Sequence, residues 1–111
     1  MSRGTVKLSG GEITFGVWTN GDGNQAVRRA CSDRELSRIT TEKGLQMYVN
    51  AMTTNWLLAY SIQRGSGFLK GESVVDTFNN IQKLKIDDAA KLGRAFKEFH
   101  DSIMEDVKKK V

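Results

Sequence analysis

The sequence has no proline, one cysteine and one histidine among its 111 residues. Without proline, helices can run uninterrupted, and the turns must rely on glycine, asparagine and aspartate. A single cysteine, Cys31, excludes a disulfide within the chain, which indicates a reducing compartment such as a cytoplasm, or the host cytoplasm for a viral protein. One histidine and one cysteine are also too few for a zinc site of the usual composition within one chain.

The chain also lacks the patterns of a signal peptide and of a membrane span. Residues 1–11 are polar and glycine-rich, without an apolar segment. The longest uncharged stretch, residues 44–63, has roughly the length of a membrane span. Seven of its residues are Gln, Asn, Thr or Ser, and these would need hydrogen-bond partners in lipid. We therefore expect a cytoplasmic protein without a membrane partner.

The composition is that of an ordinary globular protein, with 39% hydrophobic and 27% charged residues. A chain of 111 residues can bury a core of its own, so residues 1–111 are predicted to form a single domain. The net charge of +4 is not concentrated in one region: residues 1–44 and residues 64–111 each carry an excess of +2. Such an even balance permits nucleic-acid binding without demanding it.

The first part of the chain, residues 1–31, reads as a β meander. Polar and apolar residues alternate in Thr5–Ser9 and again in Glu12–Thr19, and the glycine pair between them suits a tight hairpin turn. The sequence NGDGN at residues 20–24 is a dense turn signal. The segment Gln25–Cys31 after it reads as a third strand or as a short helix, and the strand is favoured because the turn suits a hairpin.

The second part, residues 32–111, is predicted to be helical. Ser32 and Glu35 have the spacing of a capping box for a short helix that ends near Ile39. Apolar residues at helical spacing then predict three longer helices: a central helix over 41–64, one over 74–84, and a last helix that begins at Asp87 or Asp88. The predicted fold class is therefore α+β, a hairpin or three-stranded meander followed by a short helix and three longer ones.

The central helix has no charged residue between Gly44 and Gln63. Small domains rarely cover a helix on every side, and a charge-poor face with Tyr, Trp and Met is typical of an interface core. We therefore predict a non-catalytic protein that binds macromolecules. Its predicted partners are a second copy of itself, in a two-fold dimer, and an unidentified protein. Its size and single cysteine suit a phage or mobile-element accessory or inhibitor protein. The predicted interface residues are Asn50, Thr53, Trp56, Leu57 and Tyr60.

An alternative hypothesis is a single-stranded nucleic-acid-binding protein that uses the outer face of the sheet. If Ile13, Phe15 and Val17 face the helices, Trp18 faces outward. Lys7 would share that outer face, and Arg28 or Arg29 would join it from the third strand. An exposed Trp among Lys and Arg can stack on bases while the cations neutralise phosphates.

A small nucleotide-binding enzyme is the remaining alternative. Residues 21–26 match G-x-G-x-x-A, but this motif needs a βαβ unit that the sequence does not show, and a glycine-rich turn is the simpler interpretation. Cys31 and His100 could in principle form a nucleophile and its base. Nothing in the sequence brings them together, and the small residues around Cys31 suggest a buried thiol. We therefore predict no catalytic residue, no metal site and no cofactor.

Overall fold

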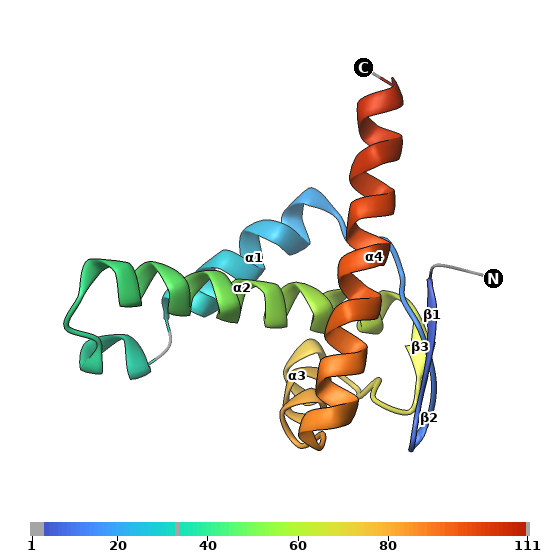
Figure 1. The fold of residues 1–111 in the computed structure, drawn as a ribbon, viewed down its shortest axis with the longest axis horizontal. Coiled ribbons are helices and arrows are strands. Elements are labelled where there is room, and N and C mark those ends of the chain that lie inside the picture. Colours follow the sequence, from blue (N-terminus) through green and yellow to red (C-terminus); the bar gives the residue numbers. More distant parts are fainter. Residues whose placement is uncertain (1–3, 33, 111) are drawn as a thin grey trace.

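Figure 1 shows the computed structural model, which describes residues 4–32 and 34–110. A small antiparallel sheet lies at one side of the molecule, and the helices make up the rest. The predicted α+β class is confirmed. The elements in the described part of the chain are β1 (Thr5–Leu8), β2 (Gly11–Thr14), α1 (Asn20–Cys31), the 3-10 helix η1 (Arg34–Arg38), α2 (Glu42–Arg64), β3 (Ser66–Gly67), α3 (Val74–Gln82) and α4 (Ile86–Lys110).

The predicted N-terminal hairpin is confirmed. Strands β1 and β2 pair antiparallel with Leu8 opposite Gly11, so that Ser9 and Gly10 form the turn. The third strand of the sheet is β3, which follows the central helix and pairs antiparallel with β2 through Ile13 and Gly67. The sheet therefore has three strands, but its third strand comes from the segment between the helices predicted over 41–64 and 74–84.

Of the two alternatives for residues 25–31, the favoured third strand is wrong and the helix is confirmed, because these residues belong to helix α1. The Thr19 side chain accepts a hydrogen bond from the Asp22 amide at 3.1 Å, and the Asp22 carboxylate accepts one from the Thr19 amide at 2.9 Å. This reciprocal pair is a capping box, which satisfies amides that have no partner within the helix. The NGDGN sequence therefore begins a helix rather than closing a hairpin.

The second predicted strand is also shorter than expected. Strand β2 ends at Thr14, and Val17 is 57% exposed instead of facing the core. The Phe15 amide still donates to the Gly4 carbonyl at 2.7 Å. From Gly16 onward the chain leaves the sheet and follows the end of α2: the Gly16 amide donates to the Ser61 carbonyl at 2.8 Å, and the Ser61 hydroxyl donates to the Gly16 carbonyl at 2.7 Å.

Helix α2 is the element against which the other parts pack. It begins after Thr41, whose side chain accepts from the Gly44 amide at 3.1 Å, and it ends at Arg64 before Gly65, as predicted for residues 41–64. Helices α1 and α3 and strand β3 contact it, and α4 crosses it (Figure 1). The main core contains these buried side chains: Val6, Leu8, Ile13, Phe15, Leu58, Ala59, Ile62, Leu69, Phe78, Ile81, Leu92 and Phe96.

A close backbone contact fixes where α2 meets the sheet. A Cβ atom added at Gly65 would lie 1.9 Å from the Thr14 carbonyl oxygen, and one at Gly16 would lie 2.5 Å from the Arg64 carbonyl carbon. Both distances are far below van der Waals contact, so only glycine allows the two backbones to approach this closely.

The short helix predicted to end near Ile39 is the 3-10 helix η1. Ser32, the predicted cap residue of this helix, instead follows the end of α1, where its hydroxyl donates to the Arg28 carbonyl at 2.8 Å. Helix α3 ends at Gln82 and α4 begins at Ile86, each within two residues of the prediction. No helix in the described part of the chain is long and apolar enough to cross a membrane.

Helix α4 continues beyond the core. Along its predicted apolar stripe, Leu92 and Phe96 are buried, Phe99 is half-buried, and Val107 is 49% exposed. The C-terminal part of the helix projects from the body of the molecule, and the N-terminal half of α2 projects in another direction (Figure 1). The radius of gyration of 14.3 Å exceeds the value of about 13 Å expected for a compact domain of this length.

Candidate interaction surface on helix α2

The two halves of α2 lie in different environments. The first buried side chain along the helix is Leu58, and none of residues 42–57, all of which the structure describes, is buried. Met47 is 64% exposed and Leu45 is 38% exposed. Residues 44–57 of the uncharged stretch therefore lie in the part of α2 that projects from the fold.

One side of this half is occupied by contacts within the chain. The Trp56 ring stacks on Phe78 of α3, with centroids 3.8 Å apart and an angle of 8° between the planes. On α1, the Arg29 guanidinium lies 4.9 Å from the centre of the Trp56 ring, and its Nε donates to the Tyr60 hydroxyl at 3.1 Å. Trp56 and Tyr60, both predicted interface residues, thus join α2 to its neighbours.

The opposite side of α2 is open. We define the open face as the exposed and uncharged residues that share an arc of the helix: Gln46, Met47, Asn50, Ala51 and Thr54. The other two predicted interface residues adjoin this face, since Thr53 and Leu57 are half-buried beside it. The Thr54 hydroxyl donates to the Asn50 carbonyl at 3.0 Å, within the helix.

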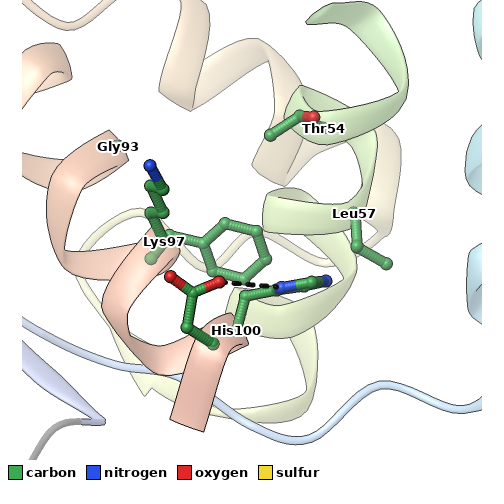
Figure 2. A pocket seen from close by; sticks show the side chains of 7 residues that line it. Thr54, Leu57, Gly93, Lys97 and His100 are labelled. Carbon is green, nitrogen blue, oxygen red and sulfur yellow. Dashed lines mark ion pairs between the residues drawn. The ribbon is translucent and has the colours of Figure 1, made fainter. Parts of the chain in front are cut away.

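At its C-terminal end the open face meets a hollow between α2 and α4, with a volume of about 420 Å³ (Figure 2). Leu57 and Phe96 supply apolar walls, and Gly93 supplies no side chain, so the α4 backbone is accessible there. A Cβ atom at Gly93 would meet nothing within 4 Å. The hollow is lined by Thr54, Leu57, Gly93, Phe96, Lys97, His100 and Asp101.

Charged groups lie around the hollow. The Lys97 and Asp101 side chains, both on α4, line it and are exposed. The His100 ring stacks on Trp18, with centroids 5.3 Å apart and planes 8° apart, and its Nδ1 lies 3.7 Å from an Asp101 carboxylate oxygen (Figure 2). Because Trp18 also contacts Phe96 and Phe99, the His100 ring is held by packing.

The one hydroxyl in the hollow, that of Thr54, donates to a backbone carbonyl of its own helix. Among the described residues, no three His, Cys, Asp or Glu side chains are grouped closely enough to hold a metal ion. An apolar hollow with one cation and one anion beside it suits the side chain of a docking partner.

The structure distributes the predicted nucleic-acid-binding residues over separate elements. Lys7 is exposed on β1, opposite Glu12 of β2. Trp18 lies outside the sheet, against α4, so the prediction that it projects from the outer sheet face is wrong. Arg28 and Arg29 are on α1, and Arg29 is engaged by Trp56 and Tyr60. No stacking platform of the predicted kind is formed by these four residues.

The structure also places Cys31 and His100, the two residues of the enzyme hypothesis. Cys31 is exposed at the C-terminal end of α1, so the expectation of a buried thiol is wrong. His100 stacks on Trp18, which lies before the opposite end of that helix. The two are therefore not brought together. The glycine-rich segment at residues 20–24 forms the first turns of α1.

Asp22 in that segment forms an ion pair with Arg64 of α2. The Arg64 guanidinium donates to both of its oxygens, with Nη2 3.0 Å from Oδ1 and Nε donating to Oδ2. This hydrogen bond lowers the pKa of Asp22, and burial opposes it only in part. The sequence carries no local signal for this pair, because its partners belong to different helices and are far apart in the chain.

Sequence reasoning also missed the hollow. Gly93, Lys97 and Asp101 were not predicted to meet α2, because helical spacing shows which residues share a face but not where two helices cross.

No protein-family model, no curated protein and no solved structure matches this chain.

Proposed function

We propose that this chain is a non-catalytic cytoplasmic binding protein that self-associates through the open face of α2. The observation that carries the proposal is the coincidence of two properties on one surface. Residues 44–63 contain no charge, and the half of α2 that projects from the core presents this uncharged surface to solvent.

A helix face in water usually carries charged side chains, as the outer face of α4 does with Arg94, Glu98 and Glu105. The open face of α2 instead offers amides, a hydroxyl and the Met47 side chain. Depletion of charge together with Met is typical of the centre of an interface. Burial of Met47 against a partner would also remove apolar surface from water.

Self-association explains this composition well. In a two-fold dimer each patch meets its own copy, so a charged residue near the axis would oppose a like charge. A neutral face avoids this repulsion, and amide side chains can both donate and accept across the axis. The single exposed cysteine, Cys31, fits a reducing cytoplasm.

Sedimentation velocity over a range of protein concentrations tests the proposal. We expect a concentration-dependent dimer for the unmodified chain. Asn50→Glu should weaken it about tenfold or more, because like charges opposed across an interface cost several kcal/mol. Val75→Glu is the matched control, since Val75 is 40% exposed on α3, away from the open face. A chain that remains a monomer at all concentrations, or a dimer insensitive to Asn50→Glu, would overturn the proposal.

A further inference from the structure

The open face of α2 leaves the hollow between α2 and α4 unfilled. Met47 and Thr54 belong to the same straight helix as Leu57, so the open face cannot fold back into the hollow of its own chain. A side chain that fills the hollow must therefore come from another segment. The charges at this end of the surface indicate which one.

Lys43 is the last charged residue before the uncharged stretch, and it lies on the same arc of α2 as Met47, Asn50 and Thr54. Its position is unfavourable for the helix itself, because a cation in the first turn opposes the positive end of the helix dipole. Lys43 is exposed.

Lys43 and Leu57 are placed symmetrically about Asn50. Each lies seven residues from it, or about 10 Å along the helix axis at 1.5 Å per residue. In an antiparallel pair of α2 helices that crosses at Asn50, Lys43 of each copy lies opposite Leu57 of the other. Leu57 lines the hollow, and Asp101 lies beside it.

We propose that the partner is a second copy of this chain, related by a two-fold axis beside Asn50, with Lys43 of each copy seated in the α2–α4 hollow of the other. The aliphatic stem of Lys43 packs against Leu57 and Phe96, and its ammonium pairs with the Asp101 carboxylate. The two Asn50 amides hydrogen-bond across the axis. This arrangement rests on the proposed self-association and specifies its geometry.

Charge complementarity supports this geometry. Asp101 and Lys97 line the hollow, and Lys43 is exposed on the arc of α2 that carries the open face. An antiparallel crossing therefore brings Lys43 of each copy to the hollow where Asp101 of the other copy supplies an opposite charge. The His100 ring is stacked on Trp18 and lies beside Asp101, so it limits the movement of the α4 side of the hollow.

A charge exchange tests the pairing. Lys43→Glu and Asp101→Lys should each weaken dimerisation about fivefold, because each change disrupts two symmetric, exposed pairs that contribute about 0.2–1 kcal/mol each. The double variant Lys43→Glu/Asp101→Lys should restore most of the loss. The melting temperature of the dilute monomer gives a second readout: Lys43→Glu should raise it slightly, since an acid suits the first turn of the helix. Weaker association in a more stable monomer separates the interface from misfolding.

A disulfide test locates the axis. In a Cys31→Ser background, Asn50→Cys should form a disulfide-linked dimer on oxidation, since residues on the axis are close to their own copies. Asn79→Cys, at an exposed position of α3, is the matched control and should not. A dimer in sedimentation that neither cross-links at position 50 nor recovers in the double variant would overturn this arrangement and leave the proposed function intact. A monomer would overturn both.

Discussion

Arg64, the last residue of α2, holds Asp22 in the first turn of α1, and this pair joins two helices whose sequences are far apart. Arg64 Nη2 lies 3.0 Å from Asp22 Oδ1, and Nε donates to Oδ2. Asp22 also accepts from the Thr19 amide at 2.9 Å and is 8% exposed. One carboxylate therefore caps α1 and fixes it to the end of the central helix.

Removal of this carboxylate should destabilise the fold. Asp22→Ala loses the charge-assisted bonds to Arg64 and the bond to the Thr19 amide, so we expect the free energy of unfolding to fall by about 1–3 kcal/mol. Thermal unfolding followed by circular dichroism measures the change. Asp76→Ala is the control, because Asp76 also lies in the first turn of a helix but is exposed. Equal losses in the two variants would contradict the role assigned to Arg64.

The same pair predicts a dependence of stability on pH. The hydrogen bond from Arg64 lowers the pKa of Asp22 below its value in the unfolded chain, which is about 3.9. The stabilisation is therefore complete above about pH 4 and is lost as the pH falls through the lower, folded pKa. Urea unfolding of the chain and of Asp22→Asn across the acid range tests this. The decline should be shallower in Asp22→Asn, and parallel curves would exclude a contribution from Asp22.

Two glycine substitutions should have opposite effects. Gly65→Ala would place a Cβ atom 1.9 Å from the Thr14 carbonyl oxygen, so α2 and β2 must separate, and we expect a loss of about 3 kcal/mol or more. Gly23 lies in α1 with nothing within 4 Å of its Cβ position, so Gly23→Ala should add about 0.5–1 kcal/mol through helix propensity. Chemical unfolding measures both. A tolerated Gly65→Ala would contradict the close backbone contact.

Substitutions of Trp56 and Met47 should separate effects on the stability of the monomer from effects on dimerisation. Trp56 is stacked on Phe78 and covered by Arg29, so Trp56→Ala should lower the stability of the dilute monomer by about 3 kcal/mol. Met47 is 64% exposed, so Met47→Ala should change the stability of the dilute monomer by less than about 0.5 kcal/mol. The same substitution should weaken the dimer. If Met47→Ala destabilises the monomer as much as Trp56→Ala, the open face is part of the core instead.

The elements that could be predicted from the sequence are those with local signals. The limits of α2 follow from Thr41 and Gly65, and the hairpin follows from alternating residues around Gly10 and Gly11. The sequence favours a strand over a helix at residues 25–31 because the capping residues of α1, Thr19 and Asp22, lie among glycines that also suit a turn. The other support of α1, which includes the bond from Arg64 to Asp22 and the bond from Arg29 to Tyr60, is not local.

The surface could be predicted only in part. The neutrality of α2 is visible in the sequence, but which side of the helix is open depends on where α1, α3 and α4 pack. Asn50 proved exposed, while Trp56 and Tyr60 are held by Arg29. Strand β3 has two residues, which is too short for an alternating pattern, and its pairing with β2 depends on the close approach at Gly65.

Hydrogen exchange should distinguish the two halves of α2 directly. The amides from Gln46 to Thr54 belong to a segment without a buried side chain, whereas those after Leu58 lie in the core, so in dilute solution the first group should exchange faster through local opening. At concentrations at which the chain dimerises, binding stabilises the closed helix by mass action. Protection should then rise in the first half of α2 and around Lys97 and Asp101 on α4, while α3 remains unchanged. The measurement is peptide-resolved mass spectrometry at two protein concentrations, with Asn50→Glu as the monomeric reference. A uniform rise over the whole chain, or a rise confined to the sheet, would place the interface elsewhere.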